Sequence, residues 1–311
     1  MPKAERQIIE RVRRLVQEGS PGRGALVTGI GDDCAILRPA AGDELLVTTD
    51  FSLEDMHFRR AWHPPESVGH RCLTRGLSDI AAMGGQPLAV FLSLALPSDL
   101  EQRWVDRFYT GLLQLAQKHG ATLAGGDTAQ SPTGILADIM VIGSVPRGKA
   151  LLRSGARPGD RIYVTGKLGL GGSTVRRLYG GEQVRPTGTY FYPEPRITIG
   201  QNLRGIASAM IDISDGLSTD LSHIYDESNV GAVIYASAIP VAATATLDDA
   251  LNGGDDYELL FTSSKRVPKK IAGVPITEIG HIVQRTGMWM QDDSGKTKRL
   301  KSGGWQHFSR S

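Results

Sequence analysis

Aspartate placed beside glycine recurs along most of the chain, and this recurrence constrains the possible folds more than any other feature. Six short acidic segments carry it: Gly29–Asp33, Thr48–Asp50, Leu77–Asp79, Gly125–Asp127, Asp212–Gly216 and Gly253–Glu258. We expect these segments to form turns, because glycine and aspartate favour turns. Repeated carboxylates next to backbone N–H groups suit a site that holds hard cations together with a polyphosphate. The pattern therefore indicates phosphoryl-transfer chemistry.

The composition is that of a globular protein with unusually many glycines. The chain has 311 residues, a length typical of about two domains. Its hydrophobic share of 40% and charged share of 22% are enough to build buried cores. The 38 glycines exceed the usual share of about 7%, and they follow no collagen-like period. We expect the excess in turns and where backbone lies close to a ligand.

Charge and cysteine content exclude several protein classes. The net charge of +2 is spread without a basic stripe, which argues against a nucleic-acid partner. Cys34 and Cys72 match neither a zinc motif nor a disulfide scaffold, so we expect reduced, partly buried thiols. Residues 1–19 have the period of an amphipathic helix and not of a secretion signal. The most apolar run, residues 88–96, is too short to span a bilayer, so a cytoplasmic protein without membrane partners is expected.

Strands and helices alternate in the hydrophobic pattern, which predicts an α/β fold. Helices are expected over residues 1–19, 65–83, 99–119 (capped by Pro97–Asp99), a stretch after Gly172, 193–209 and 216–227. Strands are expected over residues 44–49, 90–96, 122–124, 135–145, 161–165, 210–213, 230–236, 258–262 and 276–282, with a hairpin across 292–295. The pattern is interrupted over residues 146–160, which predicts a domain boundary there.

Three of these strands, residues 44–49, 122–124 and 210–213, lead directly into acidic segments. In α/β proteins, ligands gather at the carboxyl ends of strands. Carboxylates brought together there would repel by about 4 kcal/mol per pair at ~4 Å and an effective dielectric of ~20, unless cations lie between them. Because Mg²⁺ takes one or two carboxylates plus phosphate oxygens, several aspartates imply several ions. Each acidic segment taken alone also fits a helix cap or an Asx turn.

Familiar nucleotide-binding motifs are missing from the sequence. Gly295-Lys-Thr297 lacks the earlier glycine of a phosphate-binding loop, because position 290 is methionine. Neither Gly29-Ile-Gly31 nor Gly169-Leu-Gly171 continues as a dinucleotide fingerprint. The protein-kinase motifs are also absent. A bound nucleotide would therefore need a different scaffold.

The six acidic segments, in this order, resemble those of the thiamine-monophosphate kinases, over about residues 25 to 310. This family transfers the γ-phosphoryl group of ATP to thiamine phosphate and belongs to the aminoimidazole ribonucleotide synthetase-like superfamily. The resemblance implies a mixed α/β (α+β) fold of two domains. Residues 1–148 would carry most of the metal and ATP acids and a sheet that pairs across a homodimer. Residues 149–311 would complete the ATP site and the thiamine phosphate pocket.

The resemblance also assigns site residues. The residues implied as ligands of several Mg²⁺ ions are Asp33, Thr48, Thr49, Asp50, Asp79, Asp127, Asp212 and Asp215. Those implied to contact ATP are Tyr109, Gly126, Asp127, Arg153 and Ser214. Those implied to contact thiamine phosphate are His57, Glu258 and Trp305. Asp50, Asp127 and Arg153 would stabilise charge, and no residue is assigned as a general acid or base.

The chemistry of these side chains is compatible with the implied roles, although simpler structural roles stay open. Arg153 can neutralise phosphate with its forked guanidinium, or it can form a surface ion pair. The indole of Trp305 can stack on a thiazolium cation, or it can pack in a core. His57 can be a plain surface histidine, and Glu258 can point from a strand to solvent. Residues 239–252 are shorter than expected for the family by about one helix, which affects the substrate pocket most.

The expected reaction yields thiamine diphosphate by direct in-line transfer, without a phosphoenzyme. The acceptor phosphate is already anionic near neutral pH, so alignment and charge neutralisation would supply the catalysis. Two alternatives stay open. One is another ATP-dependent enzyme of the superfamily, a purine-pathway amidine cyclo-ligase or a selenophosphate synthetase, although no reactive cysteine precedes Cys34. The other is a non-catalytic nucleotide-binding regulator.

Overall fold

A computed structural model describes residues 5–19, 25–31, 33–306 and 308 of the chain. These residues divide into two compact units. The N-terminal unit runs to Ile80 and includes Gly85–Gly148 and Pro186–Glu194. The C-terminal unit contains Ala81–Gly84, Lys149–Arg185 and the chain from Pro195 onward. None of the helices in the described part of the chain has the length and apolar character that a membrane span needs.

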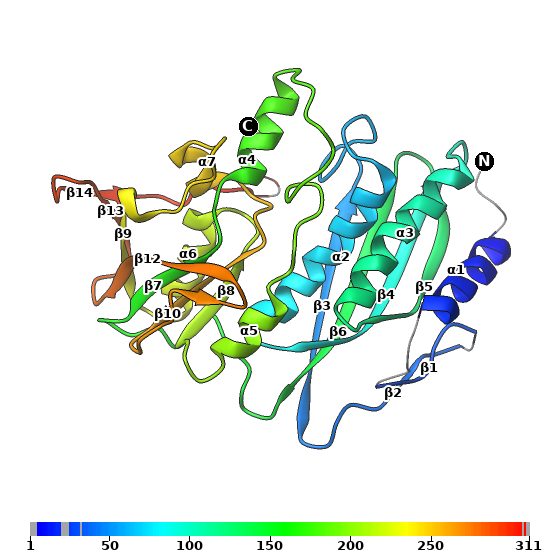
Figure 1. The fold of residues 1–311 in the computed structure, drawn as a ribbon, viewed down its shortest axis with the longest axis horizontal. Helices are drawn as coiled ribbons and strands as arrows, with labels where there is room; N and C mark the ends of the chain where they lie inside the picture. Colours follow the sequence, from blue (N-terminus) through cyan, green and yellow to red (C-terminus); the bar gives the residue numbers. More distant parts are fainter. Residues whose placement is uncertain (1–4, 20–24, 32, 307, 309–311) are drawn as a thin grey trace. The chain divides into compact units, whose positions relative to one another are not determined.

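The N-terminal unit is built on a four-stranded sheet with the order β3-β6-β4-β5. Its strands are β3 (Asp43–Leu53), β4 (Gln86–Pro97), β5 (Thr122–Ser131) and β6 (Leu136–Pro146). β6 pairs antiparallel with β3 and with β4, whereas β5 lies parallel to β4 at the opposite edge from β3. A separate two-stranded sheet joins β1 (Leu26–Thr28) to β2 (Ile36–Leu37). Figure 1 shows α2 (Pro65–Ala82) and α3 (Gln102–Lys118) along one face of the larger sheet, with α1 (Glu5–Gly19) beside β5.

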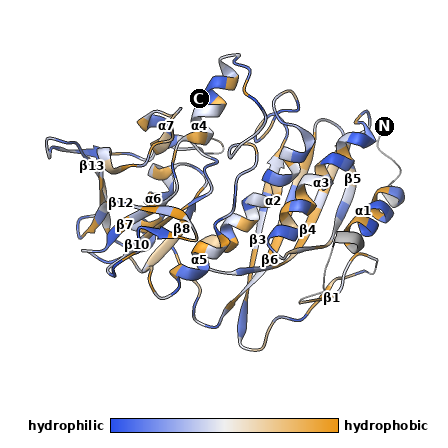
Figure 2. Cartoon of the chain, in the orientation of Figure 1, coloured by the Kyte–Doolittle hydropathy of each residue, from blue (hydrophilic) through white to orange (hydrophobic). Residues whose placement is uncertain are grey.

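Helix α3 has one buried and one more exposed face, whereas every residue of α2 is buried or half-buried. Figure 2 shows hydrophilic and hydrophobic residues interspersed along both helices. They cross backbone to backbone at two glycines. A Cβ atom on Gly69 of α2 would lie 2.0 Å from the carbonyl oxygen of Phe108, and one on Gly111 of α3 would lie 1.9 Å from that of Glu66. Only glycine permits this approach, because any side chain would overlap the facing backbone.

The C-terminal unit contains an eight-stranded sheet with the order β14-β13-β9-β12-β7-β10-β8, and β11 pairs with β12 off this path. Its strands are β7 (Arg161–Thr165), β8 (Ala209–Ile213), β9 (Gly231–Tyr235), β10 (Glu258–Ser263), β11 (Lys270–Ile271), β12 (Val274–Val283), β13 (Gly287–Gln291) and β14 (Thr297–Leu300). Its helices are α4 (Leu170–Tyr179), α5 (Ile197–Leu203), α6 (Leu217–Glu227), α7 (Leu247–Asn252) and the short 3₁₀ helix η1 (Ala236–Ala238). The hairpin predicted across residues 292–295 is confirmed as the antiparallel pair β13–β14.

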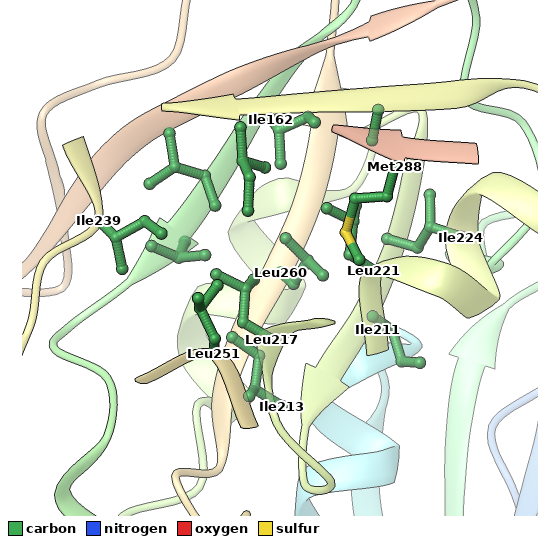
Figure 3. Packing of buried hydrophobic residues seen from close by; sticks show 14 of the residues in the cluster. Ile162, Ile211, Ile213, Leu217, Leu221, Ile224, Ile239, Leu251, Leu260 and Met288 are labelled. Carbon is green, nitrogen blue, oxygen red and sulfur yellow. The ribbon is translucent and has the colours of Figure 1, made fainter. Parts of the chain in front are cut away.

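The core of the C-terminal unit lies between α6 and the sheet. Leu217, Leu221 and Ile224 of α6 are fully buried against Ile211 of β8 and Leu260 of β10. Figure 3 shows these side chains pointing toward one another. Their positions follow the helical spacing of i, i+4 and i+7, so one stripe of α6 covers the sheet. This packing fixes the place where β8 turns into α6.

Two predictions about helix ends were wrong. Helix α3 begins at Gln102, and its N-cap Glu101 makes no side-chain cap bond, so Asp99 does not cap it. The helix predicted over residues 193–209 is only α5, Ile197–Leu203. Pro193 and Pro195 delay its start, because the residue before a proline disfavours helical backbone.

The segment before α5 packs as part of the N-terminal unit. The hydroxyl of Ser67 on α2 donates to the carbonyl of Phe191 at 2.8 Å, and Nε2 of His70 lies 2.8 Å from the carbonyl oxygen of Pro193. These bonds hold residues 191–193 against α2, just after a turn closed by the 3.0 Å bond from the N–H of Tyr192 to the carbonyl oxygen of Gly188. This arrangement is incompatible with a helix from residue 193.

The acidic segments are less uniformly turns than expected. Asp50 lies inside β3 and Asp127 lies inside β5, so these strands continue through them. Asp79 lies within α2. The expectation of turns was therefore wrong at these three positions. Asp215 follows the end of β8, in the turn before α6.

We predict that Gly111→Ala lowers the free energy of unfolding by about 2 kcal/mol, because the added methyl group forces α3 away from α2. Chemical denaturation of the full chain measures this change. Thr110→Ala, at the exposed neighbouring position, is the control and should shift the midpoint far less. Equal stability of Gly111→Ala and the wild type would contradict the close backbone contact.

Candidate functional site

A cavity of about 570 Å³ lies in the N-terminal unit beside β5. Its wall includes four of the residues that sequence analysis assigned to metal and ATP: Asp33, Tyr109, Gly126 and Asp127. They come from three parts of the chain: the segment between β1 and β2, helix α3 and strand β5. Apolar residues of α1, among them Ile8 and Val12, line the same cavity. A pocket with apolar walls and a few convergent polar groups is the usual form of a small-molecule site.

The backbone of β5 is shaped by Gly126. Its φ angle is +142°, and a Cβ atom there would lie 1.9 Å from the carbonyl oxygen of Leu92. Glycine is therefore required at this position, and the bare backbone forms part of the cavity wall. The next residue, Asp127, is exposed, and its Oδ1 accepts a 2.8 Å bond from the N–H of Thr128. Its carboxylate thus stays accessible at the cavity.

Tyr109 lies on the buried face of α3 and is 5% exposed. Burial raises the pKa of its hydroxyl well above the ordinary value, with a smaller contribution from Cys72. The hydroxyl is therefore protonated at neutral pH and can donate a hydrogen bond to an anion or a heterocycle in the cavity.

A second group of predicted metal ligands lies on the face of the sheet that α2 covers. The hydroxyl of Thr48 donates to Oδ2 of Asp79 on α2. Asp50 is two residues further along β3 and so points to the same face. The side chain of Thr49 points to the opposite, exposed face, so the structure does not bring it together with these three residues.

Cys72 is buried beside this second group. Burial raises its pKa to about 12, the nearby charges of Asp50 and Asp138 act in the same direction, and a bond with Ser52 acts against them. Burial therefore disfavours the thiolate form of Cys72, which is fully and not partly buried. Cys34, which lines the cavity, is exposed and not partly buried as predicted.

The sheet separates these two groups. Phe51, the neighbour of Asp50 on β3, pairs across the sheet with Asp138 of β6. Asp138 pairs with Ser93 of β4, and Ser93 pairs with Asp127 of β5. Three strand spacings of ~4.8 Å place β3 and β5 about 14 Å apart. Asp50 and Asp127 of one chain therefore cannot share one Mg²⁺ ion, since Mg²⁺–oxygen distances are about 2.1 Å. The prediction that all the acids of the chain converge at one point is not met within this unit.

In the C-terminal unit, the predicted residues Asp212, Ser214 and Asp215 lie at the end of β8 and in the turn before α6. Asp220 of α6 holds this turn: its Oδ2 accepts bonds from the N–H groups of Ser214 (3.1 Å), Asp215 (3.2 Å) and Gly216 (3.1 Å). Burial raises the pKa of Asp220 well above its usual range, and the charges of Asp212 and Asp215 add to the effect. The three bonds to Asp220 therefore hold the backbone of the turn that carries Asp215 in one conformation.

Trp305 lies beside the same turn. Its backbone N–H donates to the carbonyl oxygen of Asp215 at 3.0 Å, and its side chain is 48% exposed. Packing in a core, the alternative role considered for this residue, is therefore wrong. A half-exposed indole has the chemistry to stack on a planar ligand.

Glu258 is committed to other side chains. It is 4% exposed, its Oε2 accepts a 2.7 Å bond from Nε of Arg196, and Nη2 of Arg196 bonds its other oxygen. The hydroxyl of Thr165 also donates to Oε2. The alternative that Glu258 points to solvent is therefore wrong, and a direct bond to a substrate would need this ion pair to rearrange.

Arg153 and His57 form backbone or local bonds with other described residues. The carbonyl of Arg153 accepts a 3.3 Å bond from Ser228 at the C-terminal end of α6, about 16 Å along the helix from Ser214. Its guanidinium forms no ion pair with a described residue, so the surface ion pair considered for it is absent there. His57 is half-buried just after β3, where its Nδ1 accepts a 2.9 Å bond from the N–H of Leu53.

Sequence reasoning missed Asp220, Arg196 and Asp256. Asp256 accepts bonds from the N–H groups of Gly169 (2.6 Å) and Gly171 (3.2 Å) at the start of α4, and burial raises its pKa to about 7. An acid in the first turn of a helix is a recognisable signal for Asp220, since helix N-termini favour negative charge. Asp256 gives no such signal, because it reaches the start of α4 from 87 residues away along the chain. No local pattern indicates that Arg196 pairs with Glu258, 62 residues away.

The donors at the cavity fit a magnesium ion that is bound together with phosphate. Asp33 and Asp127 offer carboxylate oxygens, and Mg²⁺ usually takes one or two carboxylates and completes its shell with water and substrate phosphate. Among the residues that the structure describes, no three His, Cys, Asp or Glu side chains are arranged to hold a metal ion by themselves.

Comparison with known proteins agrees with this arrangement. The model of the AIR synthase related protein N-terminal domain matches residues 31–145, and that of the C-terminal domain matches residues 157–288. The thiamine-monophosphate kinase of Salmonella typhimurium (strain LT2) is 40% identical over 276 residues, which cover 82% of this chain and 84% of the relative.

Solved structures give the same relationship. The thiamine-monophosphate kinase of Stenotrophomonas maltophilia K279a is 35% identical, with a TM-score of 0.81 over 95% of this chain and 98% of that chain. AaThiL complexed with AMPPCP and TMP is 29% identical, with a TM-score of 0.78 over 97% and 96% of the two chains. With both halves of the fold and most of the length matched, the chain belongs to the thiamine-monophosphate kinase family.

Proposed function

We propose that this chain transfers the γ-phosphoryl group of ATP to thiamine phosphate, giving thiamine diphosphate in a Mg²⁺-assisted, direct in-line reaction. The observation that carries the proposal is the cavity whose wall contains Asp33, Tyr109, Gly126 and Asp127. Family membership and the relative that binds AMPPCP and TMP support it. A location in the cytoplasm stays a prediction from the sequence.

The residues of the cavity suit binding and charge control. The Tyr109 hydroxyl can donate to the nucleotide, and the bare backbone at Gly126 lets phosphate approach β5 closely. Asp33 and Asp127 would hold Mg²⁺, which, when bound, would neutralise the repelling phosphates of donor and acceptor. The acceptor oxygen is already anionic near neutral pH, so no general base is needed and none is assigned.

The remaining assignments are part of the same proposal. Thr48, Asp50 and Asp79 in the N-terminal unit, and Asp212 and Asp215 in the C-terminal unit, would hold further Mg²⁺ ions. Thr49 would contribute only through its backbone, since its side chain lies on the other face of β3. Residues 1–148 and 149–311 are proposed as the two functional domains. Arg153 and Ser214 are proposed to contact ATP, and His57, Glu258 and Trp305 are proposed to contact thiamine phosphate.

A homodimer is also proposed. The face of the sheet opposite α2 exposes Leu45 (48%), Val47 (61%) and Phe51 (54%) of β3, together with Met140 (37%) of the adjacent β6. These residues alternate along paired strands and so lie on one face. A contiguous exposed apolar patch of this kind marks an association surface. A second copy of the chain is the partner that the family resemblance implies.

The activity is tested by coupled ADP release. We expect release with ATP, thiamine phosphate and Mg²⁺, and none with free thiamine or after chelation of the metal. Asp127→Asn should lower turnover by at least about a hundredfold, because a ligand for the neutralising ion is lost. Asp99→Asn, at an exposed position outside the cavity, is the matched control and should keep wild-type turnover.

Other outcomes of this assay would contradict the proposal. ADP release that requires an amidine substrate would identify a cyclo-ligase of the same superfamily. Tight ATP binding without ADP release in the presence of thiamine phosphate would identify a non-catalytic regulator. Full activity of Asp127→Asn would show that Asp127 is not a ligand of the catalytic metal ion.

The dimer is tested by substitution on the exposed sheet face. Phe51→Glu should convert a dimer of the wild-type chain to a monomer, because a charge cannot be buried unpaired in an apolar contact. Light scattering coupled to size exclusion measures the mass of each species. Tyr179→Glu, at an exposed apolar position on α4 that is 62% exposed, is the control and should stay dimeric. A monomeric wild type would refute the assignment.

A further inference from the structure

Three consecutive residues in the first turn of α6, Ser218, Thr219 and Asp220, are buried to 0%, 4% and 2% exposure. All three side chains are polar, and buried polar side chains nearly always form hydrogen bonds with specific partners. Their partners outside α6 lie mainly in two segments that carry proposed site residues, the turn that follows β8 and the C-terminal tail. The Ser218 hydroxyl also donates to Oδ1 of Asn252 in α7 at 2.7 Å.

Asp220 bonds to the turn. Its Oδ2 alone accepts the N–H groups of Ser214, Asp215 and Gly216, at 3.1 to 3.2 Å. These donors precede α6 and have no helical partners, so without Asp220 they would turn to solvent. Gly216 has a φ angle of +113°, so the backbone of the turn reverses sharply at this point. A single oxygen therefore sets the conformation that presents Asp212 and Asp215.

Ser218 and Thr219 bond to the tail. The Ser218 hydroxyl oxygen accepts the N–H of Gly303 at 3.1 Å, and that of Thr219 accepts the N–H of Gly304 at 3.0 Å. Gly304 is pressed against the turn, since a Cβ atom there would lie 2.2 Å from the carbonyl oxygen of Asp215. The next residue, Trp305, donates its N–H to that same carbonyl at 3.0 Å. The tail therefore contacts the acidic turn at two consecutive residues, Gly304 and Trp305, the second of which carries the exposed indole.

We propose that Ser218, Thr219 and Asp220 are positioning residues of the kinase site with separate tasks. Asp220 fixes the acidic turn on the metal and ATP side, and Ser218 and Thr219 fix the Trp305 tail on the acceptor side. The inference rests on the proposed function for its kinetic meaning, whereas the positioning itself is a property of the metal-free chain. It predicts that the two tasks can be lost independently.

Hydrogen–deuterium exchange of the full chain without Mg²⁺ tests the positioning. Asp220→Ala should speed exchange of the amides of residues 214–216 about tenfold or more, as three bonds are lost. Asp220→Asn should keep most of the protection, because its one side-chain oxygen can accept all three bonds. Thr219→Val should speed exchange at residues 303–305 and leave residues 214–216 unchanged.

Two matched controls lie on the same helix. Asp226→Ala removes an exposed acid, and Ser222→Ala removes a buried hydroxyl that donates to the carbonyl of Thr219 and does not touch the tail. Both should exchange like the wild type at the turn and the tail. Unchanged exchange at residues 214–216 in Asp220→Ala, or at residues 303–305 in Thr219→Val, would overturn the inference.

Kinetics separate the two tasks. Asp220→Ala should raise the Mg²⁺ concentration for half-maximal ADP release about tenfold and leave KM for thiamine phosphate within about twofold. Thr219→Val should raise KM for thiamine phosphate about fivefold, with the Mg²⁺ dependence unchanged. Equal effects of both variants on both constants would indicate general destabilisation and would overturn the division of tasks.

Two further outcomes remain decisive. If Asp220→Ala does not fold, Asp220→Asn takes its place. Exchange at residues 214–216 and Mg²⁺ dependence like those of the wild type support the inference. Exchange ten times faster there, together with a tenfold higher Mg²⁺ requirement, contradicts it. If the wild type shows no kinase activity, the proposed function fails, while the exchange measurements still support or overturn the positioning.

Discussion

Electrostatic repulsion between carboxylates is the constraint on which the arrangement of this protein depends. A chain with many acids near one reaction must keep them stable before any cation arrives. The structure does this by giving acids partners: Thr48 donates to Asp79, three N–H groups bond Asp220, and Arg196 pairs with Glu258. The strand order also keeps β3 and β5 at opposite edges of their sheet. These acids are therefore stabilised by protein groups without any bound cation.

The same constraint bears on Asp127, an exposed acid at the cavity. Asp127 needs no partner beyond the N–H of Thr128, because solvent stabilises its charge. Glu258 and Asp220, which are buried, need strong partners and cannot act as free ligands without giving them up. Exposure thus separates carboxylates suited to ions from those that shape the backbone.

Much of the C-terminal unit could be predicted from its sequence, since β7, β8 and β10 are short apolar runs bounded by turn residues. The N-terminal unit was harder. Local chemistry favours a turn at Gly125-Gly-Asp127, yet the strand continues, because parallel pairing with β4 holds even Gly126 at its positive φ angle. Asp50 likewise lies in β3, which pairs with β6 along its whole length. Tertiary pairing outweighs local preference at both places.

The candidate site could be predicted only for residues assigned from the resemblance, which rests on the order of the six acidic segments. The resemblance named Tyr109, Gly126 and Asp127, and the structure brings them together at one cavity. The pairing of Arg196 with Glu258 depends on the register of distant strands, and no sequence pattern specifies it. Arg153 could not be placed from its motif, because its position follows from the bond to Ser228 at the far end of α6.

We propose that Mg²⁺ binds at the cavity between the carboxylates of Asp33 or Asp127 and the phosphates of ATP. Anomalous diffraction from Mn²⁺ in crystals grown with a non-hydrolysable ATP analogue tests it most directly. We expect Mn²⁺ within coordination distance of both a phosphate oxygen and the carboxylate of Asp33 or Asp127. Nucleotide bound in the cavity with Mn²⁺ absent from those carboxylates would contradict it.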